Sequence, residues 1–354
     1  MAFDPDLAIR QLVEIYRAAY LRLLEIIATK EARGRVTGFE RALLADVNAI
    51  LLELDRTAKA WAAEVIPKVY TGSAETVYEA WLAAGLTPPA FDARYAQVHR
   101  AAIEALVANF QDQLDDAHRF VGRRIRDQWR RAQLEVVAEK ISTGRTVREA
   151  KRALQERVAA EGIGAFRDSK GRIWRLDAYA EMVARTTTTE ATNAGLLNQL
   201  RGMGRDLVQL TQHRSPCPIC APYEGRVYSI SGKDKRYPPL SVVPGFDKGY
   251  QTLHPNCRHR ASPYVEELAD DPEGDRIRSN RPFEDRRSEA EKRAYEREQE
   301  RNRLRRERRK LEQQLAVLPP GEERDRVRER LRAIRSEQRA LGREQREYLD
   351  EIGT

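Results

Sequence analysis

Residues 215–230, SPCPICAPYEGRVYSI, contain two of the three cysteines in a chain of 354 residues, and the third lies in HPNCRHR, residues 254–260. All of the thiols are therefore gathered in one region. Residues 1–20, MAFDPDLAIRQLVEIYRAAY, have no basic segment followed by an apolar core, so they do not read as a secretory signal. We expect a soluble protein made and kept in a reducing cytoplasm, where clustered cysteines indicate a metal site rather than disulfides.

Two pairs of soft ligands predict that metal site. Cys217 and Cys220 have Cys-x2-Cys spacing, which lets a tight turn direct two thiolates at one ion. His254 and Cys257 form a His-x2-Cys pair after an intervening stretch of expected strands. Four such ligands match the tetrahedral Cys3His arrangement of structural zinc, and they leave no position for a catalytic water. We therefore predict one structural Zn2+ per chain, held by Cys217, Cys220, His254 and Cys257.

Other interpretations of the same residues stay open. The cysteines could be buried small apolar side chains beside a chance histidine. A thioredoxin-like redox pair is disfavoured, because no clear helix follows Cys220 to lower a thiol pKa. The stretch HPNCRHR invites comparison with His-Asn-His nucleases, but its first histidine is already needed for zinc. We expect His213 and His259 to be surface residues or outer partners of the ligands, and Glu224 to be an exposed turn carboxylate.

The first 145 residues are predicted to be all α, because apolar residues recur at steps of three and four. The expected helices cover residues 4–33, 39–65 and 91–141, the last as one helix or two. The first two should form an αα-hairpin. Pro67, Gly72 and the TPPA at 87–90 are expected to punctuate a shorter helix between the second helix and the third.

A small α+β module is expected over residues 146–265. Thr146 and Glu149 have capping-box spacing, which predicts a helix to about residue 161. The stretch AFRDSKGRIWRL then alternates around a turn at 168–171 and indicates a β-hairpin. Another helix is expected over 177–203. Short strands and loops should follow from 207 to 263, the part of the chain that holds the cysteines.

The tail, residues 266–354, is rich in Arg and Glu at helical spacing, which gives many weak i,i+4 pairs of about 0.2–0.5 kcal/mol each. LPPGEE at 318–323 should join two helices. Their thin apolar stripe suits helix pairing or partner docking better than a thick core. The stripe consists of Leu304, Leu311, Leu315, Val327, Leu331, Ile334 and Leu341. The predicted fold class is thus α+β, predominantly α, with long N-terminal helices, a small zinc-stapled α+β module and a charged C-terminal helical hairpin.

The net charge of the chain is compatible with more than one class of binding partner. The chain is 33% charged with a net charge of +8, which is compatible with nucleic acid or with acidic protein partners. The glutamates interleaved along the tail count against a pure DNA-binding arm. No window approaches the roughly 18 consecutive apolar residues of a membrane span, so we expect no membrane contact.

Residues 179–195, YAEMVARTTTTEATNAG, together with the cysteine region, resemble the phage minor capsid protein 2 family and, more distantly, the Mu F-like minor head proteins. The shared hallmark is a Cys-x2-Cys, a Gly-Lys/Arg-Val segment and a closing His-Pro-x-Cys-Arg. The resemblance is closest over 175–310 and loose elsewhere. The matching residues are Cys217, Cys220, Gly225, Arg226, Val227, Pro238, Pro239, His254, Pro255, Asn256, Cys257 and Arg258.

The resemblance implies a low-copy structural head protein of a tailed phage or prophage. Such a protein would be made in the host bacterial cytoplasm and would reside in the virion, in the capsid interior or at the portal vertex. Its implied partners are the portal and other head proteins, with packaged DNA as a further contact through the basic surface. Its implied roles are head assembly, DNA packaging or delivery, and no enzyme activity is expected.

Two alternatives from other classes remain. One is a zinc-containing DNA-binding or nuclease protein. The other is an ADP-ribosyltransferase-like effector, because some Mu F-like modules are suspected relatives of these enzymes, which use an Arg, a Ser/Thr strand and a catalytic Glu. Arg185, the threonines at 186–189 and Glu190 supply these types within one expected helix, whereas the enzymes spread them over separate strands. The competing interpretation is a helix face that packs and hydrogen-bonds against the small sheet.

Overall fold

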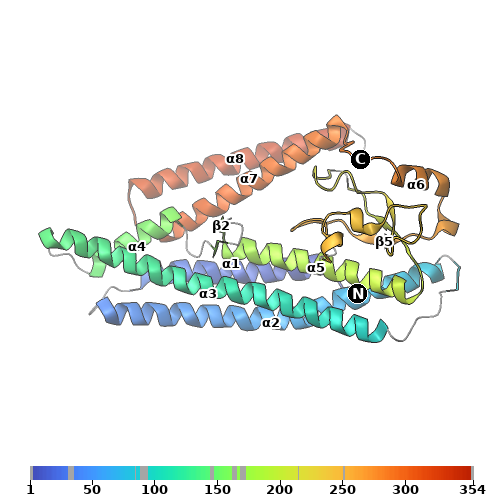
Figure 1. The fold of residues 1–354 in the computed structure, drawn as a ribbon. Coiled ribbons are helices and arrows are strands. Elements are labelled where there is room, and N and C mark those ends of the chain that lie inside the picture. The colour runs from blue at the N-terminus through green and yellow to red at the C-terminus, as the bar shows by residue number, and fades with distance from the viewer. Residues whose placement is uncertain are drawn as a thin grey trace. The chain divides into compact units, whose positions relative to one another are not determined.

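A computed structural model describes residues 3–30, 36–83, 85–87, 95–143, 147–161, 166–167, 173–213, 215–249 and 252–351 (Figure 1). The chain divides into two compact units, each built from separated segments. Unit 1 comprises Met1–Leu12, Ala58–Leu114 and Glu181–Tyr295. Unit 2 comprises Val13–Thr57, Asp115–Ala180 and Glu296–Thr354. The three consecutive segments predicted from the sequence, 1–145, 146–265 and 266–354, stay a prediction about folding units.

Helices dominate the described residues, and a small antiparallel sheet accompanies them. The helices are α1 (Pro5–Thr29), α2 (Val36–Ala83), α3 (Tyr95–Thr143), α4 (Val147–Glu161), α5 (Leu176–Gly202), α6 (Pro272–Ser279), α7 (Glu289–Val317) and α8 (Glu322–Glu351). The strands are β1 (Phe166–Arg167), β2 (Ile173–Trp174), β3 (Leu207–Leu210), β4 (Val227–Ser229) and β5 (Ala261–Pro263). The predicted class, α+β and predominantly α, is confirmed. Within the described ranges, no helix is apolar over enough of its length to span a bilayer.

The first helix begins as the sequence predicts. The Asp4 side chain accepts hydrogen bonds from the backbone N–H groups of Asp6, at 2.9 Å, and Leu7, at 3.1 Å. These are two of the N–H groups that a helix start leaves without an intrahelical partner. Pro5 occupies the first helical position, where its missing N–H costs nothing. The expected end of this helix, at about residue 33, lies outside the described residues.

The predicted punctuation at Pro67 and Gly72 is wrong, because α2 runs unbroken through both residues. A proline inside a helix removes one backbone hydrogen bond and costs about 3 kcal/mol. Here Ile66 and Tyr70, on either side of the proline, are at most 1% exposed. Burial of these side chains in unit 1 therefore outweighs the cost of a proline inside the helix, on which the predicted break was based. Farther on, α3 is a single helix rather than two.

The predicted β-hairpin is also present. β1 and β2 pair antiparallel, with Phe166 opposite Trp174 and Arg167 opposite Ile173. Its turn lies outside the described residues, as does Thr146, the predicted cap of α4. The helix that follows the hairpin, α5, covers the range expected from the sequence to within one residue at each end.

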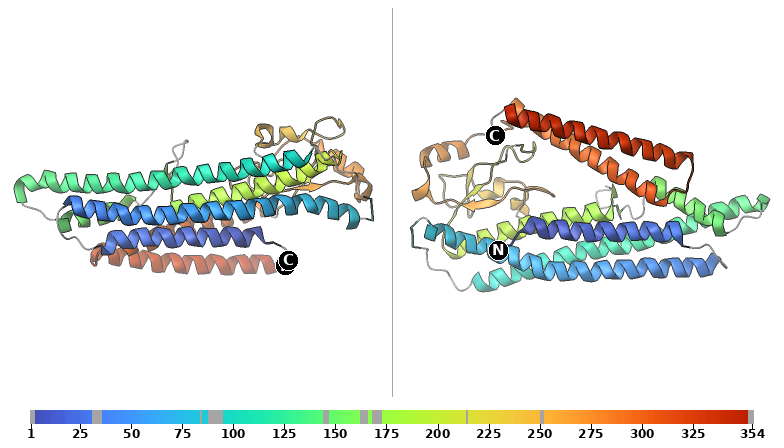
Figure 2. Two further views of the ribbon diagram at one scale, coloured as in Figure 1. Left: turned by 90° about the horizontal axis from the view of Figure 1, so that it is seen from below. Right: turned by 180° about the vertical axis from the view of Figure 1, so that it is seen from behind.

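Within unit 2, α7 and α8 lie side by side (Figures 1 and 2). Leu304, Leu311, Leu331 and Ile334 are buried between them, and Leu315, Val327 and Leu341 pack against this cluster. The predicted apolar stripe is thus confirmed in full. The tail also contacts other helices of the unit. Arg17 of α1 pairs with Glu312 of α7 at 3.4 Å, and Gln314 donates to the carbonyl of Ala159 in α4 at 3.2 Å.

Within unit 1, a three-stranded antiparallel sheet with strand order β4-β3-β5 packs beside α5. Val208 of the central strand lies opposite Tyr228 on one side and Pro263 on the other. The core of this unit combines Leu196, Leu197 and Leu200 of α5 with the buried sheet residues and with Cys220 and Cys257. Cys220 and Cys257 are therefore part of a hydrophobic core.

Close approach of α2 and α5 depends on Gly195. A methyl group in place of its hydrogen would lie 2.3 Å from the carbonyl oxygen of Tyr70, well inside the closest distance that such atoms tolerate. Hydrogen bonds flank this contact. Ser73 donates to the carbonyl of Thr192 at 2.6 Å, and Asn198 donates to the Tyr70 hydroxyl at 2.8 Å. The glycine thus sets the spacing at which the two helices of unit 1 can pack.

We expect Gly195→Ala to lower the thermal midpoint, because overpacking a tight contact costs about 1–3 kcal/mol. Gly72→Ala in α2 is the matched control, since nothing lies within 4 Å of the added carbon. That change should raise the midpoint, because alanine is favoured over glycine inside a helix by up to about 1 kcal/mol. Differential scanning calorimetry compares the two variants. Equal stabilisation by both would contradict the close approach at Gly195.

Candidate metal centre

The first ligand pair sits on a tight turn between β3 and β4. The backbone N–H groups of Cys220 and Ala221 both donate to the carbonyl of Cys217, at 3.0 Å each. This turn brings the two sulfurs to one side, as the Cys-x2-Cys spacing predicts. Cys220 is 1% exposed, whereas Cys217 is half-buried.

The second pair sits on a turn just before β5. The Cys257 N–H donates to the carbonyl of His254 at 3.0 Å. Asn256, between them, has a φ of 64°, a left-handed conformation that asparagine tolerates better than most residues. Cys257 is 1% exposed. Each predicted ligand pair therefore lies on a tight turn. Such a turn directs both side chains of a pair to the same side, as one ion bound by two pairs requires.

The structure brings the predicted ligands together in two overlapping groups that share Cys220, with Cys257 in a different group from Cys217 and His254. Cys217 Sγ lies 3.3 Å from His254 Nε2, and Cys220 Sγ lies 3.8 Å from Cys257 Sγ. The ligand atoms of Cys217, Cys220 and His254 all lie within 4.8 Å of one another. All three cysteines are free thiols, so they are available to a metal. Three thiols and an imidazole at these distances have the composition of a structural zinc site.

A second histidine joins the cluster, in the position of an outer partner of the ligands, which is one of the two places expected for it from the sequence. His259 is 5% exposed, and its Nδ1 lies 3.5 Å from Cys257 Sγ. Its Nε2 lies 2.9 Å from the Glu224 carboxylate, whose side chain is 7% exposed. Cys220, Cys257 and His259 therefore form a second triad within 4.8 Å. The prediction of an exposed turn carboxylate at Glu224 is wrong, because the carboxylate is needed to pair with a buried imidazole.

Each histidine has an outer partner on its remaining nitrogen. Nδ1 of His254 lies 2.7 Å from the carbonyl oxygen of Pro255, and Nε2 of His259 faces Glu224. Such partners fix the ring orientation and tautomer of metal-binding histidines. Glu224 also accepts a hydrogen bond from the backbone of His213 at 3.2 Å. The His213 ring stands edge to face with that of His259, with centroids 4.3 Å apart. His213 is thus an outer neighbour of the cluster, as expected.

Hydrogen bonds among the sulfurs lower the pKa of two thiols and so favour the thiolate form that binds a cation. The Cys220 thiol lowers the pKa of Cys217 to about 4 and also lowers the pKa of Cys257, while its own pKa is raised. The bond to Cys217 raises the pKa of His254 to about 9. Burial opposes the charged form of His259, but its bonds to Cys257 and Glu224 raise its pKa to about 9. Two thiolates are thus favoured near neutral pH, and metal binding would release the remaining protons.

One face of α5 holds the second turn in place. Thr186 Oγ1 accepts a hydrogen bond from the Asn256 N–H at 3.1 Å, and Thr189 Oγ1 donates to the Cys257 carbonyl at 3.1 Å. Asn193 accepts from the Ala261 N–H at 2.8 Å. Residues 186, 189 and 193 recur at helical spacing, so they lie on one face. The threonine run therefore does what the helix-face interpretation expects.

The hallmark Gly-Arg-Val segment has a structural role in the same unit. Gly225 has a φ of 68°, and the Arg226 guanidinium bonds to the end of α6 and to the segment after it. Arg226 donates to the carbonyls of Ser279, Arg281 and Pro282 at 3.2, 2.5 and 2.9 Å, and its guanidinium carbon lies 4.5 Å from the Phe283 ring centroid. Arginine suits this task because its planar fork carries several donors at once.

The residues named for the transferase alternative do not converge. Arg185 forms an ion pair with Glu181 at 3.1 Å. A cavity of about 700 Å3 is lined by Arg185, Thr188 and Thr189 among others, but not by Glu190. Glu190 is 8% exposed, and burial raises its pKa to about 7. A raised pKa occurs in buried structural carboxyls as well as in catalytic ones. The geometry therefore gives no support to an Arg–Glu pair around a shared ligand.

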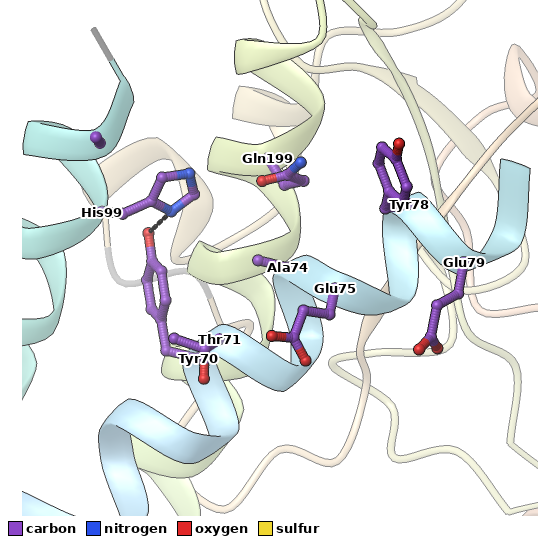
Figure 3. Close-up of a pocket in the computed structure, with 9 residues that line it drawn as sticks. Tyr70, Thr71, Ala74, Glu75, Tyr78, Glu79, His99 and Gln199 are labelled. Carbon is purple, nitrogen blue, oxygen red and sulfur yellow. Dashed lines mark hydrogen bonds between the residues drawn. The ribbon is translucent and has the colours of Figure 1, made fainter. Parts of the chain in front are cut away.

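A different cavity of unit 1, of about 610 Å3, lies among α2, α3 and α5 (Figure 3). The Tyr70 hydroxyl lies 3.0 Å from His99 Nδ1, and burial lowers the pKa of His99. Glu75 and Glu79 add carboxylates to the lining. No sulfur ligand lines it, so this cavity is separate from the metal-ligand residues.

Comparison with known proteins agrees with a phage structural protein. A family model described as phage minor capsid protein 2 matches residues 5–349. The chain therefore belongs to the phage minor capsid protein 2 family, which confirms the resemblance. It is also similar to a protein named "Structural protein" of Lactococcus phage LL-H, with 33% identity over 104 residues. That alignment covers 28% of either chain, so less than a third of the relative is matched. No solved structure matches the chain.

The buried Glu190 predicts a pH dependence of stability. Its pKa rises from an ordinary 4.5 to about 7 on folding, so the folded state holds this proton more tightly than the unfolded state. The resulting penalty is absent below pH 4.5, grows through pH 7, and reaches at most about 3 kcal/mol. We expect Glu190→Gln to gain stability over the parent protein at pH 8 but not at pH 4.

Urea unfolding at the two pH values measures this difference. Glu79→Gln, at an exposed glutamate of α2 in the same unit, is the control for replacing a surface carboxylate with an amide. The same shift at pH 4 and pH 8 for Glu190→Gln would show that this carboxyl is not held in its neutral form.

Proposed function

We propose that this minor capsid protein is a head component of a tailed phage that associates with the portal vertex and acts in head assembly, DNA packaging or delivery. The observation that carries the proposal is the family match over nearly the whole chain. A structural role in the phage particle follows from that family. The family does not specify a location within the head, so the portal vertex is our proposal.

Exposed apolar side chains on the long helices support protein partners. Tyr78 and Leu82 of α2 are 47% and 56% exposed, and four-residue spacing places them on one face. Leu7 of α1, in the same unit, is 47% exposed. Such side chains gain free energy when a partner covers them, at about 25 cal/mol per Å2 of apolar surface. Long helices that present them suit a protein that lies against other subunits.

Cross-linking mass spectrometry on particles of the encoding phage tests the portal association. We expect cross-links from unit 1 lysines, such as Lys68, to portal subunits, and a copy number close to that of the portal. Cross-links spread evenly over the major shell protein would exclude a vertex location. Absence of the chain from purified particles would overturn the head assignment itself.

We further propose that the cysteine region binds one structural Zn2+ through Cys217, Cys220, His254 and Cys257. Support comes from the two tight turns, the sulfur and nitrogen distances, and the lowered pKa values of two thiols. His259, oriented by Glu224, would then bond to the Cys257 sulfur from outside the ligand set. A structural zinc ion contributes folding free energy on the order of 10 kcal/mol in small peptides. It would stabilise a loop-rich module that has only a small sheet.

Replacing Cys257 with serine should remove the metal and loosen the module at 207–263. We expect about one zinc per chain in the reduced parent protein by elemental mass spectrometry, and none in Cys257→Ser. His213→Ala is the control, because His213 neighbours the cluster but belongs to neither ligand triad. It should keep its zinc. A metal-free parent protein, or zinc retained by Cys257→Ser with unchanged thermal stability, would overturn the assignment.

A further inference from the structure

The cavity beside the second metal-ligand turn is rich in arginine. It belongs to unit 1, measures about 700 Å3, and is lined by residues from the start of α1, from α5 and from the segments that flank the sheet. Its charged lining consists of Arg10, Arg185, Arg258, Arg260 and Asp6. Four arginines and one aspartate give the lining a net positive charge, which favours an anionic ligand.

Backbone alternation explains how two of these arginines face away from the metal cluster. Residues 258–260 lead directly into β5, and their exposure alternates as it does along a strand, where successive side chains point to opposite sides. His259 is 5% exposed and contacts Cys257, whereas Arg258 and Arg260 on either side of it are exposed. The same turn that presents the metal ligands therefore presents two cations to the cavity.

Arg258 and Arg260 differ from the other two arginines of the lining, because no ion pair within the described residues neutralises their charges. Arg10 and Arg185 have carboxylate partners, Asp4 at 3.5 Å and Glu181 at 3.1 Å. Arg258 and Arg260 form no ion pair with any carboxylate in the described part of the chain. An arginine fork fits the oxygens of phosphate in a bidentate way, which distinguishes it from the point charge of lysine.

The segment that carries them is held firmly. The Arg260 N–H donates to the Thr211 hydroxyl at 3.0 Å, and Thr189 and Asn193 of α5 bind the backbone on either side. Thr211 and Gln212, also in the lining, are of the side-chain types that contact nucleic-acid phosphates alongside arginine. A rigid backbone limits the ordering cost of binding to the side chains themselves.

We propose that this cavity binds the phosphate groups of a nucleic acid strand, with Arg258 and Arg260 as the principal contacts. Phosphodiester oxygens match both the forks and the polar neighbours, and the volume exceeds what one phosphate needs. The inference deepens the proposed role in a DNA-filled head by naming the site of contact. The binding experiment below uses purified protein without the portal, so a negative result would not bear on the proposed portal association.

Fluorescence anisotropy with a labelled oligodeoxythymidylate tests the site, using the full-length reduced protein. We expect Arg258→Ala/Arg260→Ala to weaken binding by about tenfold or more and to flatten the dependence on salt by roughly one unit of slope per arginine. Lys233→Ala/Lys235→Ala is the matched control. It removes two positive charges from exposed positions of the same unit outside the cavity, and it should weaken binding by less than about twofold.

Three further arms make the test decisive. Inorganic phosphate should compete with the oligonucleotide better than chloride does at equal ionic strength. Arg258→Lys/Arg260→Lys keeps the charge but loses the forks, so it should bind with intermediate affinity. Equal losses in the alanine pair and the lysine control, or no binding by the parent protein, would overturn the proposal. Tighter binding of polyglutamate than of the oligonucleotide would instead assign the cavity to an acidic protein partner.

Discussion

The hydrogen bonds from one face of α5 to the backbone at 256–261 are the constraint on which the rest of unit 1 depends. Thr186, Thr189 and Asn193 fix the position of a turn that has little regular structure of its own. That turn presents Cys257 to Cys220 on one side and two arginines to a cavity on the other. A helix thereby supplies the rigidity that a loop lacks, because the bonds to Asn256 and Cys257 satisfy backbone groups that lie outside the strands.

The cysteine cluster belongs to a hydrophobic core and also has the composition of a metal-ligand set. Cys220 and Cys257 pack against leucines of α5 and the buried face of the sheet, yet their sulfurs face each other and two imidazoles. Buried cysteines often serve only as small apolar side chains. Here a buried Glu224–His259 pair stands beside them, and a buried charged pair is costly unless its partners are well placed. Its presence is better explained by sulfur ligands that need orienting than by apolar packing.

The charged tail illustrates how a helical hairpin can be stable without a thick core. Each surface ion pair between α7 and α8, such as Arg330 with Glu307 at 2.9 Å, contributes little because water screens it. The narrow stripe of leucines is buried instead, and contacts to α1 and α4 add to it within unit 2. The apolar stripe that packs α7 against α8 could be predicted from the sequence, because its apolar residues recur at helical spacing among Arg and Glu.

The sequence by itself determined the helical class, the apolar stripe of the tail, the two tight turns that carry the proposed ligand pairs, and the family, because each depends on spacing along one segment. Short-range signals were weakest where packing opposes them. Pro67 and Gly72 looked like breaks, but burial of Ile66 and Tyr70 keeps α2 continuous. Only the tertiary structure decided that His259 and Glu224 join the cysteine cluster and that Gly195 sets the spacing of α2 and α5. These relations join residues far apart in the chain, where no local pattern records which side chains will meet.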